Sequence, residues 1–224
     1  MNKLFITATD TDAGKTLVAC ALTQALINQG LNVSTFKPLS AGCELIDGQL
    51  VNDDAYKLQQ LSNCQQKLHQ VNPFAFEEPI APHIAAKKLA QVITTHDIQR
   101  AFKEHCDIPC DFSITEGAGG WRLPLGNGQF LSEFVQQEQM AVILVVNMKL
   151  GCLNHATLTY ESIKNDGLNV VGWVANCPEE MPYLTENINE LTNIIEAPML
   201  GQIGYVTNSE EAVKQLSISP LLNI

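Results

Sequence analysis

The chain has 224 residues, 46% of them hydrophobic, and its formal net charge is −11. This length and apolar content predict a single α/β domain over residues 1–224 with a substantial core, and they exclude extended disorder. The acidic balance argues against nucleic acid or an anionic membrane surface as a partner, because such contacts need clustered Lys and Arg.

The chain offers no feature of an exported or membrane-spanning protein. Its longest apolar run, at 141–146, has the length of a strand. The glycine-containing loop described below begins near residue 8, which leaves no room for a signal peptide. Seven cysteines without a C-x-x-C pair fit neither a disulfide framework nor a zinc site. We therefore expect a cytoplasmic protein with reduced thiols.

Strand-like and helical patterns alternate along the chain, which predicts βαβ units and a mostly parallel sheet flanked by helices. The expected strands are 4–7, 33–36, 112–115, 141–146, 170–175 and 199–203. The expected helices are 17–30, 53–61, 83–89, 97–105, 131–137, 154–165 (capped by Asn154) and 183–195. Asp47-Gly48 predicts a small hairpin, and the proline-rich stretch 72–82 a loop.

The most informative stretch is Ala8-Thr9-Asp10-Thr11-Asp12-Ala13-Gly14-Lys15-Thr16, between the first expected strand and helix. A strand, a loop ending Gly-Lys-Thr and a helix form the phosphate-binding P-loop. Lys15 would reach the terminal phosphates, and the Thr16 hydroxyl would hold Mg²⁺. Thr9 stands where the standard pattern has Gly. The alternative is an ordinary strand-to-helix turn that needs Gly14 for its backbone angles.

Polar residues also follow the other expected strands. Lys37 follows 33–36, Glu116 follows 112–115, Asn176 follows 170–175, and Asp54 starts the helix at 53–61. Ligands of parallel sheets bind at the carboxyl ends of strands, so these residues are candidates for phosphate, Mg²⁺ and base contacts. Each has an ordinary alternative: Asp54 as a helix cap, Lys37 and Glu116 as solvated side chains, and Asn176 as a turn residue.

Five segments together carry a resemblance to a known family: residues 9–16, 36–38, 116–121 (Glu-Gly-Ala-Gly-Gly-Trp), 145–155 and 172–176. They resemble the dethiobiotin synthetase family, P-loop NTPase-like enzymes that use ATP and Mg²⁺ to close the ureido ring in biotin synthesis. The similarity extends over nearly the whole chain. It implies a cyclo-ligase acting on 7,8-diaminononanoate, CO₂ or bicarbonate, and ATP.

The resemblance also implies roles for individual residues. The implied catalytic residues are Lys37, Lys15 and Thr11, and the implied metal ligands are Thr16, Asp54 and Glu116. The implied ATP-binding residues are Asp12, Ala13, Gly14, Lys15, Thr16, Leu17, Asp54, Glu116, Gly117, Ala118, Gly119, Asn176, Cys177, Gly204, Tyr205, Val206 and Glu211.

The family forms homodimers in which the diamino acid binds between subunits. The implied substrate-binding residues are Thr11, Lys37, Ser40, Ala41, Gly119, Leu150, Gly151, Cys152 and Asn154. Three positions depart from the family pattern: Ala8 and Gly204 replace the usual Gly and Pro, and Ala41 replaces a substrate-contacting Ser beside Ser40.

Two other classes of P-loop protein are alternatives. A regulatory GTPase would need Asn-Lys-x-Asp, whereas the nearest segment, 147–150, lacks the carboxylate. A partition-type ATPase scaffold generally carries a Lys five places before the P-loop Lys, where this chain has Asp10. A nucleotide-binding pseudoenzyme is a third alternative that only an assay can exclude.

Overall fold

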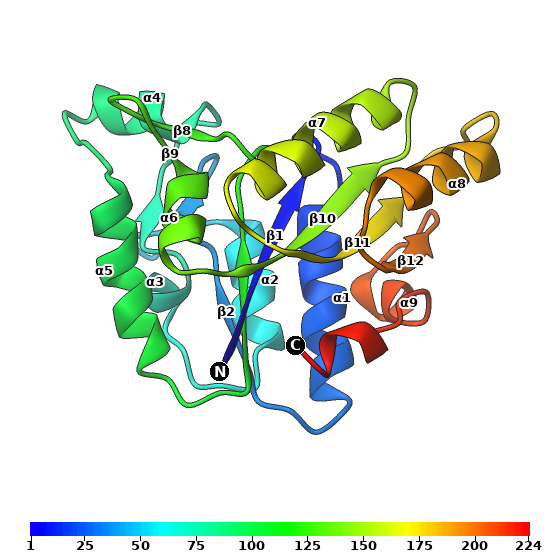
Figure 1. Ribbon diagram of the computed structural model, residues 1–224. Helices are drawn as coiled ribbons and strands as arrows, with labels where there is room; N and C mark the ends of the chain where they lie inside the picture. Colours follow the sequence, from blue (N-terminus) through cyan, green and yellow to red (C-terminus); the bar gives the residue numbers. More distant parts are fainter.

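A six-stranded parallel sheet forms the centre of the computed structural model, which describes residues 1–224 (Figure 1). The strand order is β12-β11-β10-β1-β7-β2, and every pairing is parallel. The strands are β1 (Asn2–Ala8), β2 (Val33–Phe36), β7 (Phe112–Glu116), β10 (Ala141–Asn147), β11 (Val170–Asn176) and β12 (Met199–Ile203). The predicted fold class is confirmed.

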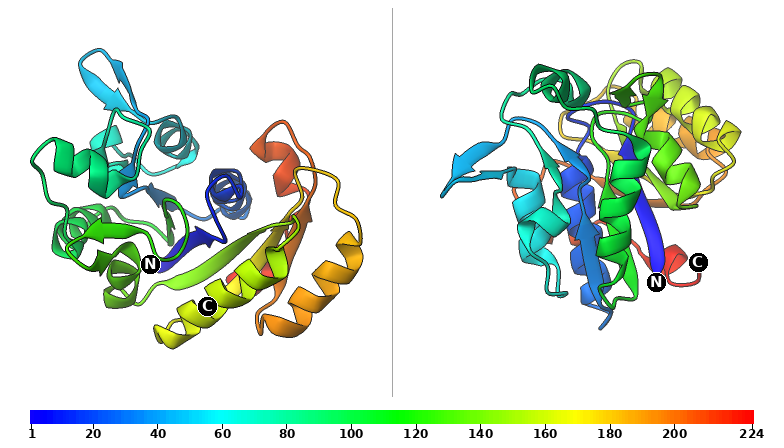
Figure 2. Two further views of the ribbon diagram at one scale, coloured as in Figure 1. Left: turned by 90° about the horizontal axis from the view of Figure 1, so that it is seen from above. Right: turned by 90° about the vertical axis from the view of Figure 1, so that its left-hand side faces the viewer.

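Helices cover both faces of this sheet (Figure 2). They are α1 (Lys15–Ile27), α2 (Asp53–Leu61), α3 (Leu68–Val71), α4 (Pro82–Lys88), α5 (Thr95–Cys106), α6 (Leu131–Gln137), α7 (Cys152–Asn165), α8 (Leu184–Ile194) and α9 (Ser209–Val213), with a 3₁₀ turn η1 (Ser219–Leu221). Residues of α1, α2 and α9 share one buried apolar cluster, and residues of α4 to α8 share the other. None of the helices combines the length and apolarity that crossing a lipid bilayer requires.

The inner strand β10 shows how the sequence specifies these two layers. Val142, Leu144 and Val146 belong to the cluster beneath α5 to α8, whereas Ile143 and Val145 belong to the cluster beneath α1. Successive side chains of a strand point to opposite faces, so a continuous run of β-branched and aliphatic residues fills both layers. The predicted place of this segment at the centre of a parallel sheet is confirmed.

Three two-stranded sheets lie outside the central one. They are β3 (Leu39–Ser40) with β6 (Phe74–Ala75), the hairpin of β4 (Glu44–Ile46) and β5 (Gln49–Val51), and the hairpin of β8 (Pro124–Gly126) and β9 (Gln129–Phe130). The hairpin at Asp47-Gly48 was predicted. The parallel pair β3–β6 was not, and it crosses the segment predicted to be only a loop.

Five predicted helix starts differ from the structure by one or two residues, and two of these have an identifiable cause. Asn154 does not cap α7, because Gly151 occupies the N-cap position with φ of +94° and the helix begins at Cys152. Tyr183 is not helical either: it precedes α8 with φ of +57°. In both places a left-handed residue sets the start of the helix, a conformation that the hydrophobic pattern does not reveal.

Candidate active site

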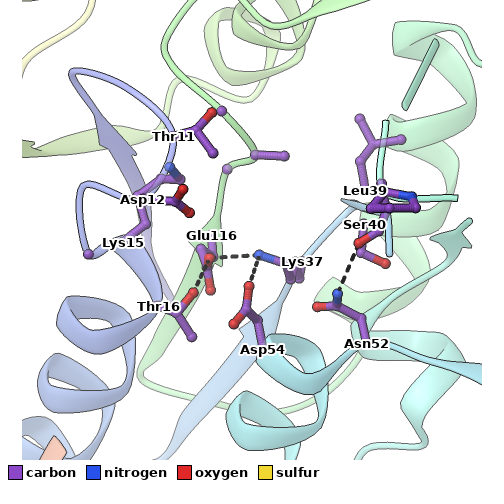
Figure 3. A pocket seen from close by; sticks show the side chains of 16 residues that line it. Thr11, Asp12, Lys15, Thr16, Lys37, Leu39, Ser40, Asn52, Asp54 and Glu116 are labelled. Carbon is purple, nitrogen blue, oxygen red and sulfur yellow. Dashed lines mark hydrogen bonds and ion pairs between the residues drawn. The ribbon is translucent and has the colours of Figure 1, made fainter. Parts of the chain in front are cut away.

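The polar residues predicted at the strand ends lie together at one edge of the sheet. The P-loop follows β1, Lys37 follows β2, and Glu116 and Asn176 are the last residues of β7 and β11. All four strands run in the same direction, so their carboxyl ends meet. Figure 3 shows Lys37 and Glu116 pointing toward each other between the P-loop and α2.

The backbone at the end of the P-loop has the shape of an anion cradle. Gly14 is the N-cap of α1 with φ of +92°, and Asp12 also has positive φ, at 58°. A Cβ at Gly14 would lie 2.3 Å from Nδ2 of Asn176. Gly14 is therefore required for space as well as for its backbone angles. The first N–H groups of α1 have no partners within the helix, and the helix dipole adds positive potential there.

Asn176 packs beneath this loop. It is buried, and its Nδ2 donates to the carbonyl oxygen of Ala13 at 3.0 Å. This bond fixes the loop on its inner side. A contact of Asn176 with the adenine stays a prediction.

Lys15 lies within the cradle and is largely buried. Its Nζ donates to the carbonyl oxygen of Asp10 at 3.2 Å, so the side chain folds back along its own loop. Burial lowers the pKa of Lys15, and Lys37 acts in the same direction against the opposing attraction of Glu116. An anionic ligand in the cradle would relieve this electrostatic cost.

Lys37 is the second cation of the site, and two carboxylates hold it. Its Nζ donates to Oε1 of Glu116 at 2.6 Å and lies 3.3 Å from Oδ2 of Asp54. The Lys37 side chain is 5% exposed and that of Glu116 only 1%. Burial acts to lower the pKa of Lys37, but attraction by Glu116 and Asp54 and their hydrogen bonds outweigh it and raise the pKa. Lys37 is therefore a fixed positive charge in a poorly hydrated place.

The same carboxylate suits a hard metal ion. Oε1 of Glu116 also accepts a bond from the Thr16 hydroxyl at 2.8 Å, whereas Oε2 is buried and has no hydrogen-bond partner. An orphaned carboxylate oxygen beside a hydroxyl, with the 40% exposed Asp54 carboxylate nearby, fits Mg²⁺. These are the three residues predicted as metal ligands.

The structure decides against Asp54 as a simple helix cap. Asn52 is the N-cap of α2, and its Oδ1 accepts from the backbone N–H of Ala55 at 3.2 Å. Asp54 is thus free of capping and faces Lys37 (Figure 3). The alternatives of solvated side chains for Lys37 and Glu116 are excluded by their burial.

A cavity of about 600 Å³ joins these groups. Thirteen of the predicted site residues line it: Thr11, Asp12, Gly14, Lys15, Thr16, Lys37, Ser40, Ala41, Asp54, Glu116, Gly117, Ala118 and Gly119. Three lining residues were not predicted, namely Leu39, Asn52 and Pro79. Asn52 had a recognisable signal, since Asn before Asp-Asp is typical of a helix start. Leu39 and Pro79 had none.

A second cavity of about 530 Å³ adjoins the first through Thr16 and Asp54. Leu17 lines it, together with Thr207, Asn208 and Ser209 before and at the start of α9. The predicted nucleotide residues that line neither cavity are Ala13, Asn176, Cys177, Gly204, Tyr205, Val206 and Glu211. Glu211 lies close to this second cavity, because its carboxylate accepts from the Thr207 backbone N–H at 3.0 Å.

The segment predicted to meet the substrate tail lies outside both cavities. It comprises Leu150, Gly151, Cys152 and Asn154 at the start of α7. Leu150 is 96% exposed. The neighbouring Lys149 forms an ion pair with Asp10, so this segment is tied to the P-loop.

Comparisons with known proteins place the chain in a family. A family model described as an AAA domain matches residues 2–213. The ATP-dependent dethiobiotin synthetase BioD of Aeromonas salmonicida (strain A449) is 44% identical over 225 residues, covering 99% of this chain and 100% of that protein. The protein of the same name from Cellvibrio japonicus (strain Ueda107) is 45% identical over 222 residues, covering 98% and 97%.

Among solved structures, the MinD cell division protein of Aquifex aeolicus is similar with a TM-score of 0.57 and 14% identity, covering 100% of this chain and 89% of that one. This likeness concerns the fold alone. The similarity to the synthetases is of a different order, since it extends over almost the full length at more than two-fifths identity. The chain belongs to the ATP-dependent dethiobiotin synthetase family.

Proposed function

We propose that the protein is an ATP- and Mg²⁺-dependent dethiobiotin synthetase, a ligase of biotin biosynthesis that forms C–N bonds. It converts 7,8-diaminononanoate, CO₂ and ATP into dethiobiotin, ADP and phosphate. The observation that carries the proposal is Lys37, a buried ammonium held by Glu116 and Asp54 in the cavity that the P-loop lines. Seven free thiols and the need for ATP support a cytoplasmic location.

The reaction needs positioning and charge neutralisation rather than a covalent protein nucleophile. One amine of the substrate adds to CO₂ and loses a proton, which gives a carbamate. A carbamate oxygen takes the γ-phosphoryl group from ATP, and ADP leaves. The second amine attacks the resulting carbamic-phosphoric anhydride, phosphate departs, and the cyclic urea closes. Both amines belong to one molecule, so holding them in attack geometry lowers the barrier to ring closure.

Lys37 suits the negative charge that develops in every step. Carbamate, γ-phosphoryl group and tetrahedral oxyanion are all anions, and a fixed ammonium stabilises them more strongly where water is excluded. The raised pKa of Lys37 keeps it charged at neutral pH. Thr11 and Lys15, which line the same cavity, would contact the transferring phosphoryl group.

Thr16, Asp54 and Glu116 would hold Mg²⁺ on the nucleotide phosphates. When bound, the ion neutralises phosphate charge. The phosphates would lie on the N–H groups of residues 12–17. The nucleoside would extend along the second cavity toward Asn176, Cys177, 204–206 and Glu211, because that cavity adjoins the P-loop at Thr16 and Leu17.

The substrate would bind between two subunits. Its amines would lie in the first cavity near Thr11, Lys37 and Gly119, and its tail would meet 150–154 of the partner. The 96% exposure of Leu150, just before the N-cap of α7, supports such a contact, because a large apolar side chain gains from burial in an interface. The Ser40 hydroxyl donates to Oδ1 of Asn72 at 2.6 Å, so it is not free to replace the family's substrate-contacting serine. Ala41, whose carbonyl oxygen lies 3.5 Å from Nδ2 of Asn52, would face the substrate without a hydroxyl.

The test is phosphate release in the presence of ATP, Mg²⁺, bicarbonate and the diamino acid. Release should require both carbon substrates. Lys37→Gln should lower kcat by about 100-fold or more while changing the dissociation constant for ATP by less than about threefold. Lys88→Gln is the matched control: Lys88 pairs with Glu78 on the surface, and its loss should leave both quantities unchanged.

Two results would overturn the proposal. Phosphate release that is independent of the diamino acid would instead favour a scaffold ATPase of the partition type. Preference for GTP over ATP would favour a regulatory GTPase. Normal turnover by Lys37→Gln would remove the assigned role of Lys37.

A further inference from the structure

We propose that Asn72 is a positioning residue for Lys37, an inference that rests on the proposed function of Lys37. Asn72 follows α3, is 6% exposed and does not line the cavity. Its Nδ2 donates to the carbonyl oxygen of Lys37 at 2.7 Å, and its Oδ1 accepts from the Ser40 hydroxyl at 2.6 Å. One buried amide therefore bonds two residues of the segment that carries the reactive ammonium.

Val71 and Asn72 together bond both backbone polar groups of Lys37. Its N–H donates to the carbonyl of Val71 at 2.7 Å, and its carbonyl accepts from Asn72. Lys37 lies beyond the last residue of β2, where the main sheet no longer supplies partners. Pro38 follows and has no N–H to donate. Val71 and Asn72 thus replace the sheet as the support of this residue.

The support continues along the chain. Phe74 donates to the carbonyl of Pro38 at 3.2 Å, and Phe76 donates to that of Ser40 at 3.0 Å. These bonds build the small parallel pair β3–β6. Residues 37–40 are therefore attached to residues 71–76 as one ladder, and Asn72 is the one side chain of the second segment that hydrogen-bonds to both Lys37 and Ser40.

The arrangement has a consequence for the reaction. In the structure Lys37 is also held at its Nζ by Glu116 and Asp54. With a metal ion bound to both carboxylates, their hold on the ammonium would be weaker. The backbone anchor at Asn72 would then keep Lys37 in place beside the developing anions. Loss of the anchor should reduce turnover and leave ATP binding intact, because the P-loop makes no bond with Asn72.

Asn72→Asp is the sharpest test. The carboxylate still accepts from Ser40, but it places an oxygen against the Lys37 carbonyl where the amide donated. We expect kcat to fall by about 30-fold, with the KM for ATP changed by less than about twofold. Asn72→Ala, which removes both bonds, should likewise lower kcat and leave the KM for ATP nearly unchanged. It replaces Asn72→Asp in the test if that variant does not fold.

Asn63→Asp is the matched control. Asn63 also bonds backbone at β2, since its Nδ2 donates to Leu31 at 3.0 Å and its Oδ1 accepts from Val33 at 2.8 Å, but at the end far from Lys37. It should retain kcat. In addition, when Asn72→Asp is introduced into the Lys37→Gln variant, kcat should fall little further, because both substitutions remove the stabilisation that the Lys37 ammonium provides.

A second readout is independent of turnover. In a crystal structure of Asn72→Asp, the distance from the Lys37 carbonyl oxygen to the nearest side-chain atom of residue 72 should lengthen from 2.7 Å to beyond about 3.5 Å. An unchanged distance, or full multiplication of the two kcat losses in the double variant, would overturn the positioning role. Failure of the wild type to make dethiobiotin would overturn the proposed function instead, and the crystallographic readout would still decide on Asn72.

Discussion

His105 on α5 should make the stability of the protein strongly dependent on pH. It is 1% exposed, and its ring packs 5.0 Å from that of Phe36 and 5.5 Å from that of Phe102. Nε2 lies 2.8 Å from the Ser113 hydroxyl and 3.1 Å from that of Ser34, Nδ1 lies 3.2 Å from Nε2 of Gln66, and no carboxylate hydrogen-bonds to the ring. Burial lowers the pKa of His105 from 6.5 to about 4. The native protein therefore holds this histidine neutral.

The sign of the effect follows from proton binding. Between about pH 6.5 and pH 4 the unfolded chain binds a proton at His105 and the native state does not, so the free energy of unfolding falls as pH falls through this range. Lowering the pKa of His105 from 6.5 to about 4 corresponds to about 3 kcal/mol of stability, fully available above pH 6.5 and lost near pH 4.

Urea unfolding of the wild type and of His105→Gln, followed by circular dichroism from about pH 7.5 to about pH 4, measures this contribution. The variant lacks the titrating group, so the difference between the two proteins cancels the other ionisable residues. The wild-type free energy should decline by about 3 kcal/mol more than that of the variant. Parallel pH profiles would refute the assignment of a neutral, buried His105.

Three further predictions concern the site and its support. Gly14→Ala places a methyl group 2.3 Å from Asn176 at a positive φ, so calorimetry should show ATP affinity lowered by about tenfold or more; unchanged affinity would contradict the cradle. Glu116→Gln should raise the Mg²⁺ concentration for half-maximal activity by about tenfold, because a buried carboxylate oxygen is lost, and an unaltered magnesium titration would exclude it as a ligand. Asp166→Ala leaves the indole N–H of Trp121 without its 2.9 Å bond, and thermal unfolding should report a loss of about 1–3 kcal/mol, whereas an unshifted melting temperature would disprove the contribution of that bond.

The sequence predicts the fold best where a local residue pattern by itself indicates where the segment lies in the tertiary structure. The run at 141–146 is apolar at every position, and it lies inside the sheet between β1 and β11. Lys37 and Glu116 could be placed together because parallel strands deliver their carboxyl ends to one edge. Both inferences follow from the residue pattern and need no knowledge of a particular long-range contact.

The sequence predicts poorly where a distant contact decides the outcome. Strands β3 and β6 have two residues each, too few for a periodic signal, and they exist because the segments pair with each other. The bond between Asn72 and Lys37 spans 35 positions. The start of α7 depends on the left-handed conformation of Gly151, which the residue pattern does not reveal, and the predicted cap Asn154 lies within the helix.

In the proposed reaction, the ring carbon comes from CO₂ and is joined to both amines of one substrate while ATP is converted into ADP and phosphate. Mass spectrometry of the product formed from carbon-13 bicarbonate, the diamino acid and Mg²⁺-ATP tests it most directly. We expect dethiobiotin with a single labelled carbon, formed in step with ADP and phosphate. ADP formed without labelled dethiobiotin would contradict it.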